Sequence, residues 1–176
     1  QSINPIYIIV LAPLFAMLWQ GLAKRGLEPS APAKFGLALA QVGLGFLVFV
    51  WGAGSPGGLT PVFFVFMIYL LHTTAELCLS PVGLSAMSRL SPVHMASFVM
   101  GAWFYMTAVG NFVAGKIGEA TGGEGGEMSK QGLLDIYEMF GWITIGISVV
   151  VLLLSPIVKR WMHLDTLEDH KLEGDA

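Results

Sequence analysis

Long apolar stretches alternate along the chain with short polar segments. A helix that rises 1.5 Å per residue needs roughly 20 apolar residues to cross a ~30 Å hydrocarbon core. Five stretches meet this condition, and they cover about residues 3–22, 35–53, 62–84, 93–117 and 137–158. The segments between them are rich in glycine and proline, as expected where a backbone turns. No strand-type alternation competes, so the pattern predicts an all-α polytopic fold with five membrane-spanning helices.

The composition also favours a lipid environment. Hydrophobic residues make up 55% of the 176 positions and charged residues only 12%, whereas a soluble domain averages about 25% charged residues. We therefore expect the lipid bilayer as a partner. The formal net charge of −3 argues against nucleic acid, which would require basic patches.

The basic residues predict an orientation, because the segments between five spans fall alternately on two sides. One side carries only Lys116 and Lys130. The other carries Lys24, Arg25, Lys34, Arg89, Lys159, Arg160 and Lys171. Because cytoplasmic segments carry an excess of Lys and Arg, this richer side is expected in the cytoplasm. The expectation is an integral plasma-membrane protein, in the bacterial inner membrane, with a cytosolic tail at residues 159–176.

The number of spans is odd, and the first stretch begins abruptly. Larger transporters are often built from repeats of three helices, so one span before Gln1 would complete six. We therefore expect residues 1–176 to form a partial bundle that packs against N-terminal helices of the same, larger protein.

Glu76 places a carboxylate near the middle of the third stretch. The midpoint of residues 62–84 is the polar Thr73, and Glu76 lies ~4.5 Å from it at helical rise. A charged side chain at that depth costs about 2.5–3.5 kcal/mol even on insertion scales, so it must face a cavity or a partner. Glu76 is therefore a candidate for a substrate site or a proton relay. The alternative is a protonated glutamate that bonds a neighbouring helix.

The neighbours of Glu76 strengthen this hypothesis. His72 and Ser80 lie one turn before and one turn after it, so helical spacing places all three on one face. Pro81 interrupts the backbone hydrogen bonding and Gly83 permits close helix approach, which together predict a hinge. His72 is a candidate proton-relay neighbour, or else a histidine bonded to a nearby carbonyl.

Two further positions allow two interpretations each. Asn4 before Pro5 is typical of a helix start, with Asn as the N-cap, but its amide would lie in the membrane if the helix began earlier. Trp103 and Phe104 lie about ten residues into the fourth stretch, too deep for an interfacial aromatic belt. They either pack the bundle or form the wall of a pocket.

Two kinds of chemistry are disfavoured. His72 and Glu76 form an i, i+4 pair, but no third ligand follows nearby, so no metal site is expected. An intramembrane enzyme using this pair as base and acid would need a nucleophile or a metal. Ser80 lies two turns from His72, too far along the helix to serve.

Three segments together resemble a known transporter family. The segments are QSINPIYIIVLAPLFAMLW, ELCLSPVGLSAMSRLSP and MGAWF, and they are similar to the proton-dependent oligopeptide transporters of the major facilitator superfamily. The specific signal is the E-x-x-x-S-P-x-G-x-S pattern combined with the upstream INP. The resemblance covers essentially the whole chain and aligns it with the eighth to twelfth of twelve helices, in the C-terminal bundle. The family's motifs on earlier helices, which include its usual proton-coupling residues, would precede Gln1.

The resemblance implies symport of di- and tripeptides with protons, and no other cofactor. Glu76 would hold the amino group of the peptide, and Ser80 would lie in the same pocket. Asn4 would bond the peptide backbone, while Trp103 and Phe104 would line the side-chain pocket. A cationic substrate and a proton would then compete for one carboxylate.

Two alternatives stay open at this stage. One is another major-facilitator transporter of a different small solute, although Glu76 disfavours an anion because a buried carboxylate repels negative charge. The other is the intramembrane enzyme, for which neither a suitably placed nucleophile nor a metal site accompanies His72 and Glu76.

Overall fold

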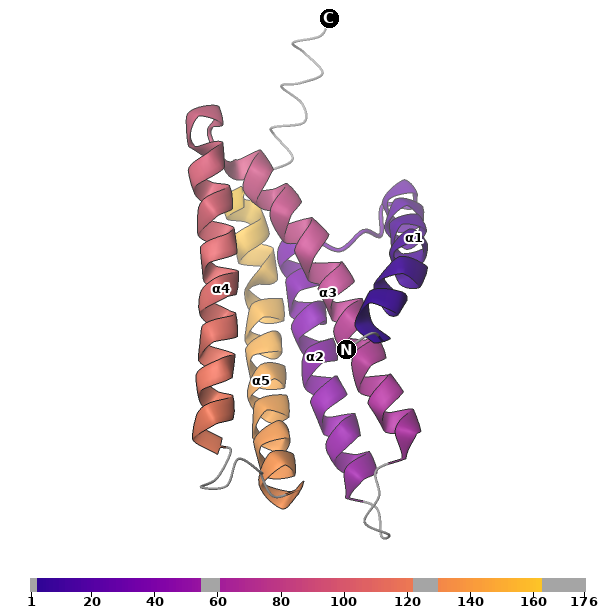
Figure 1. The fold of residues 1–176 in the computed structure, drawn as a ribbon. Helices are drawn as coiled ribbons and strands as arrows, with labels where there is room; N and C mark the ends of the chain where they lie inside the picture. The colour runs from indigo at the N-terminus through magenta and orange to yellow at the C-terminus, as the bar shows by residue number, and fades with distance from the viewer. Residues whose placement is uncertain (1–2, 55–60, 122–129, 163–176) are drawn as a thin grey trace, which may run out of the picture.

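The structure is a computed structural model that describes residues 3–54, 61–121 and 130–162. It contains five long helices, each apolar enough over 18 or more residues to cross a membrane. They are α1 (Ile3–Lys24), α2 (Ala31–Ala53), α3 (Val62–Leu90), α4 (Ala96–Thr121) and α5 (Lys130–Met162), with a short 3-10 turn η1 (Val93–Met95) before α4 (Figure 1). The all-α fold expected from the sequence is confirmed. Most of the predicted cytosolic tail, residues 163–176, lies outside the described residues.

The helices are longer than the apolar stretches that predict them. α2 begins at Ala31 because Ser30 caps it: the Ser30 hydroxyl accepts a hydrogen bond from the Ala33 amide, 3.4 Å away. Pro32 sits in this first turn, where a missing N–H is not needed. α3 runs on through Pro81 to Leu90. Hydropathy marks the part of a helix that suits lipid, whereas caps and backbone bonds decide where the helix ends.

α2 lies at the centre of the bundle and packs against both α3 and α5. The α2–α5 contact depends on small residues: a Cβ added at Gly43 would lie 2.8 Å from the carbonyl oxygen of Gly141. Nearby, the Ser148 hydroxyl donates to the Gly36 carbonyl at 2.7 Å. Close backbone approach and interhelical hydrogen bonds hold helices together where lipid removes the hydrophobic driving force between them.

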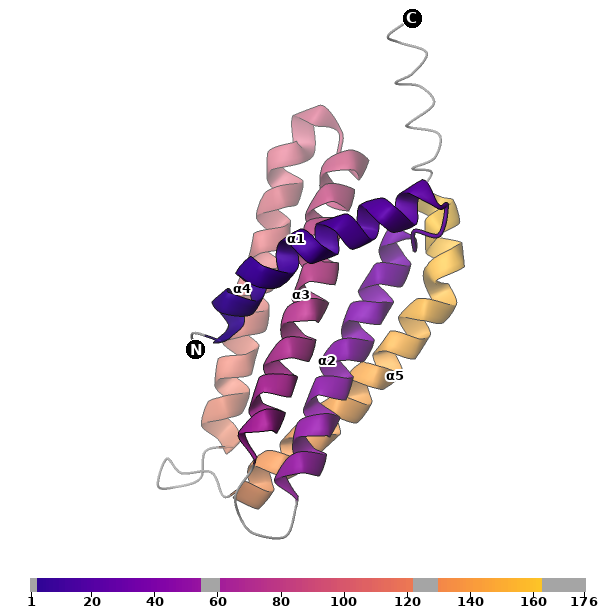
Figure 2. The same cartoon turned by 90° about the vertical axis from the view of Figure 1, so that its right-hand side faces the viewer.

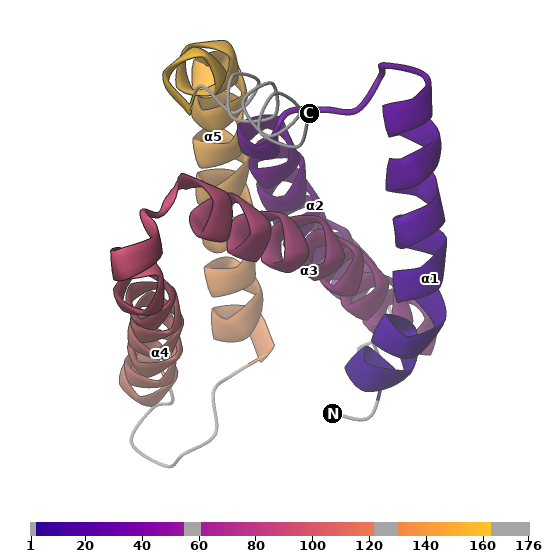
Figure 3. The same cartoon turned by 90° about the horizontal axis from the view of Figure 1, so that it is seen from above.

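The helices α1 and α4 flank α3 on opposite sides (Figure 3). α1 crosses α3 at a steep angle (Figure 2), whereas α4 meets α3 near their connection and diverges from it toward the other end of the bundle (Figure 1). Both outer helices leave large apolar side chains exposed, among them Ile9, Met17, Phe98, Met106 and Phe112. Contiguous apolar surface of this kind suits lipid or further helices rather than water. α3 thus contacts three helices, namely α1, α2 and α4.

One end of the bundle is basic. The α1–α2 connection, the α3–α4 connection and the end of α5 lie together at this end (Figure 1). It carries Lys24, Arg25, Lys34, Arg89, Lys159 and Arg160. The fold therefore gathers at one end six of the seven basic residues that the sequence assigns to one side of the membrane.

Candidate functional site

The side chains of Asn4 and Glu76 meet between α1 and α3. The Nδ2 of Asn4 donates to Oε2 of Glu76 across 3.4 Å, and the pair is exposed. α1 supplies Asn4 from its first turn, and its oblique course brings that turn to the middle of α3 (Figure 2). Of the two interpretations of Asn4, the structure therefore shows a side chain directed at another helix. Two predicted site residues far apart in the sequence lie side by side.

Thr73 completes this contact from inside the protein. Its hydroxyl donates to Oδ1 of Asn4 at 2.5 Å, and the residue is fully buried. The amide of Asn4 is therefore used at both ends: its oxygen accepts from Thr73 and its nitrogen donates to Glu76. We call Thr73, Asn4 and Glu76 the polar triad. The sequence signal for Thr73 was only its place one turn before Glu76.

His72 is directed at a different helix from Glu76. Its Nε2 lies 3.2 Å from the carbonyl oxygen of Val42 in α2. The imidazole packs edge-on against Phe46, with ring centroids 4.7 Å apart, and a Cβ added at Gly45 would lie 2.8 Å from it. A spacing of four residues turns a helix by about 40° beyond a full turn, and here that offset separates the contacts of His72 from those of Glu76. A relay role for His72 stays a prediction.

A second polar contact between α2 and α3 was not foreseen. The Thr74 hydroxyl lies 2.6 Å from Oε1 of Gln41 and can donate to it, and it also lies 3.0 Å from the Leu71 carbonyl. The Nε2 of Gln41 points to Sγ of Cys78 at 3.9 Å. The available signal was a lone glutamine in an apolar stretch. We call His72, Thr74 and Cys78 of α3, together with Gln41 of α2, the α2–α3 polar group.

The residues that follow Glu76 on α3 stay within a continuous helix. Ser80 lies one turn along and is half-buried. Pro81 is inside α3 and does not end it. The hinge predicted at Pro81 and Gly83 therefore stays a prediction, while the close helix approach expected at Gly83 has a direct structural counterpart.

Trp103 of α4 fills the space that Gly83 leaves. A Cβ added at Gly83 would lie 2.2 Å from Cη2 of the indole. The indole also meets Phe35 of α2 edge-on, with centroids 6.3 Å apart. Gly83 is seven residues from Glu76, about 10.5 Å along the helix, so Trp103 packs two turns away from the polar triad. Phe104 is exposed, and the pocket roles of both aromatics stay predictions.

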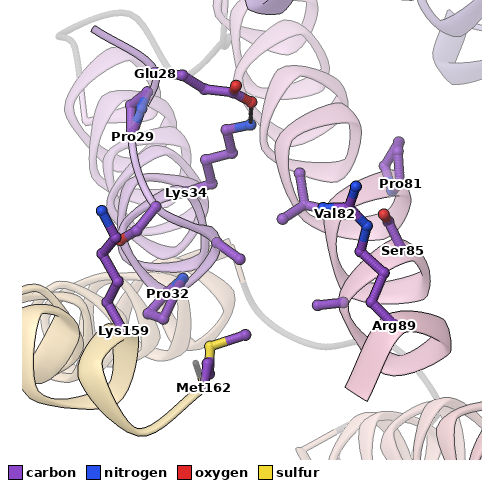
Figure 4. A pocket seen from close by; sticks show the side chains of 13 residues that line it. Glu28, Pro29, Pro32, Lys34, Pro81, Val82, Ser85, Arg89, Lys159 and Met162 are labelled. Carbon is purple, nitrogen blue, oxygen red and sulfur yellow. Dashed lines mark hydrogen bonds and ion pairs between the residues drawn. The ribbon is translucent and has the colours of Figure 1, made fainter. Parts of the chain in front are cut away.

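A separate cavity of about 350 Å³ opens at the basic end of the bundle (Figure 4). Lys34, Arg89 and Lys159 are among its lining residues, and Lys34 is ion-paired with Glu28. Of the predicted site residues, Pro81 alone lines it. The cavity is therefore distinct from the polar triad.

Metal binding finds no support in this part of the chain. Within residues 3–54, 61–121 and 130–162, no group of three or more His, Cys, Asp or Glu side chains is placed to hold a metal ion. What the polar triad offers instead is one carboxylate and one amide donor near the middle of a spanning helix. That combination suits a ligand with an ammonium group and a carbonyl oxygen.

Comparison with known proteins gives a consistent result. The model of the POT family matches residues 1–122. The chain is 37% identical over 172 residues to the peptide transporter YePEPT of Yersinia enterocolitica, covering 93% of this chain and 32% of that protein. It is 30% identical over 171 residues to the dipeptide and tripeptide permease B of Aeromonas hydrophila, covering 93% of this chain and 34% of that protein.

A solved structure agrees with the sequence matches. A crystal structure of a mutant of a peptide transporter, POT, in complex with alafosfalin superposes with a TM-score of 0.79 at 32% sequence identity. The match covers 91% of this chain and 31% of the other. The chain therefore spans about a third of the length of the proteins that it matches.

Proposed function

The chain belongs to the POT family, and from this membership we propose that it supplies the C-terminal half of the peptide site in a proton-coupled symporter of di- and tripeptides. Two similar proteins are named as a peptide transporter and as a dipeptide and tripeptide permease, which supports this substrate class. Because the POT family is a transporter family, we propose transport rather than catalysis. The proton is the only coupling ion proposed.

The chain is an integral membrane protein with five helices long and apolar enough to span a bilayer. We place it in the bacterial inner membrane with its basic end in the cytoplasm, because that end gathers the Lys and Arg residues. This orientation also puts the end of α5 on the cytoplasmic side. Labelling of a cysteine introduced at Lys159 by a membrane-impermeant reagent, in intact cells and in inverted vesicles, tests it.

The observation that carries the proposal is the contact between Glu76 and Asn4. A carboxylate deep in a spanning helix attracts an ammonium group strongly, because few water molecules screen the charges there. The amino terminus of a peptide is such a group, and its three N–H bonds are charge-assisted donors to carboxylate oxygens. Asn4 lies within reach of the same oxygen, so its amide is placed to meet the first carbonyl of the peptide.

This arrangement also supplies a basis for coupling. A proton and a peptide ammonium compete for the carboxylate of Glu76, since either one neutralises its charge. Loading and release of the peptide are then linked to the protonation of one group. His72 lies one turn away, but its bond to the Val42 carbonyl favours a packing role over a relay role. Ser80, Trp103 and Phe104 are the proposed further lining of the pocket.

The proposal is tested by proton-driven dipeptide uptake into liposomes that contain the full-length transporter. Glu76→Gln keeps the shape of the side chain and removes its charge, so we expect uptake to fall about ten- to hundred-fold, as for a lost hydrogen bond to a charged group. Glu119→Gln is the matched control, because Glu119 is exposed and paired with Lys116 at 2.7 Å on the same helix. Uptake by Glu76→Gln that equals the wild type would remove Glu76 from the site.

A further inference from the structure

The buried hydroxyls of Thr73 and Ser148 have different kinds of partner. Thr73 and Ser148 are the largest fully buried side chains of the described residues, at 0% and 1% exposure. The Ser148 hydroxyl donates to a backbone carbonyl, that of Gly36, and so fastens two helices. The Thr73 hydroxyl donates instead to the side chain of Asn4, a member of the proposed peptide site.

The Asn4 amide is held at one end by Thr73 and faces Glu76 with the other. An asparagine amide carries an acceptor oxygen at one end and a donor NH₂ group at the other. With the oxygen held by the Thr73 hydroxyl, the NH₂ group points to the carboxylate. The flipped amide would set its oxygen against a carboxylate oxygen, two acceptors without a proton between them. The ionised carboxylate therefore selects this orientation, and the Thr73 hydroxyl fixes the amide in it by donating to the oxygen.

The environment makes this orientation hard to replace. Thr73 is fully buried, and an Asn4 oxygen left without its buried partner costs free energy. Asn4 belongs to α1, which packs against α3 and against no other helix to a comparable extent. The Thr73 bond is thus one of the few polar contacts that fix the first turn of α1 on α3.

We propose that Thr73 is a positioning residue, which holds Asn4 with its N–H groups toward Glu76 and toward the incoming peptide. The inference rests on the proposed function, because it concerns the same peptide site. Thr73 does not touch the substrate; it acts through Asn4. By occupying the amide oxygen, it leaves the N–H groups of Asn4 for Glu76 and for a peptide carbonyl.

The test compares variants of the full-length transporter in the dialanine uptake assay. Thr73→Val keeps the shape and removes the hydroxyl, so we expect the apparent KM to rise about ten-fold while the maximal rate stays within about two-fold, the pattern of lost binding. Thr73→Ser retains the hydroxyl and should restore a KM within about three-fold of the wild type. Thr73→Ala serves as a second deletion of the hydroxyl if the valine variant does not fold.

Two controls separate positioning from general support of the fold. Ser148→Ala deletes an equally buried hydroxyl away from the site, and it should lower the melting temperature without changing KM. In an Asn4→Ala background, Thr73→Val should change KM by less than about two-fold, because residues that act through one another are not additive.

The outcomes are distinguishable. Absence of dipeptide uptake by the wild type overturns the proposed function and this inference together. If the wild type transports and Glu76→Gln loses uptake, an unchanged KM in both Thr73→Val and Thr73→Ala overturns the inference alone. A KM increase of the same size in the wild-type and Asn4→Ala backgrounds overturns it as well, since Thr73 would then act independently of Asn4.

Discussion

Two sides of α3 carry hydrogen-bonded polar groups at the same depth, but the two groups differ in exposure. On the side of α2, the atoms of His72, Thr74 and Gln41 find partners within the protein, and Gly45 and Phe46 close the contact. On the side of α1, the polar triad runs from a fully buried hydroxyl to an exposed carboxylate. The residue types are similar. The distinction is whether the hydrogen-bonded atoms are all enclosed by the described residues or whether the last of them is an exposed carboxylate.

The comparison indicates how the polar residues of a spanning helix can be sorted into structural and functional ones. Closed contacts hold helices together, since interhelical hydrogen bonds and small residues replace the hydrophobic force in lipid. A charged group that stays open in the membrane is expensive, and its default explanation is a ligand or a proton. We therefore expect substitutions on the two sides to separate function from stability.

The largest separation is expected between Asn4→Leu and Gln41→Leu, a matched pair of amide replacements. Asn4→Leu removes the donor to Glu76 and to the peptide, so dipeptide affinity should fall about ten- to hundred-fold. Gln41→Leu leaves the Thr74 hydroxyl bonded to the Leu71 carbonyl, so affinity should stay within about three-fold while stability falls by about 0.5–1.5 kcal/mol.

Equilibrium binding of a dipeptide and thermal unfolding in detergent measure these two effects. An equal loss of affinity in Asn4→Leu and Gln41→Leu would erase the distinction between the two sides of α3.

A smaller effect is expected from His72→Phe, on the α2 side. Phenylalanine keeps a ring against Phe46 and loses the bond to the Val42 carbonyl, so stability should fall by about 0.5–1.5 kcal/mol. We expect uptake to stay within about three-fold of the wild type, with its dependence on the proton gradient intact. Uptake that no longer responds to the gradient would support the relay role of His72 and would move this residue to the functional side.

The sequence predicted the helices and the depth of Glu76 because both follow from local properties. Hydropathy over about 20 residues defines a span, and the position of a carboxylate within it follows from the helical rise. The ends of α2 and α3 were harder to predict, since the cap at Ser30 and the continuation through Pro81 depend on backbone bonding that hydropathy does not record.

The contacts between helices could not be derived from spacing alone. Thr73 meets Asn4 across 69 positions, and this depends on the oblique crossing of α1 over α3. The same holds for Gln41 beside Thr74, and for Trp103 over Gly83. Helical periodicity placed His72 and Glu76 on one face, but it could not say that two different helices flank that face. The neighbouring helices decide which polar side chains are enclosed by the protein and which stay exposed.

The most direct test of the account is the discrimination between a free and an acetylated peptide amino terminus. We expect the wild-type transporter to bind dialanine at least about ten-fold more tightly than N-acetyl-dialanine, because acetylation removes the charge that Glu76 receives. In Glu76→Gln this preference should shrink to about two-fold or less. A variant that keeps the full wild-type preference would contradict the assignment of Glu76 as the receptor of the amino group.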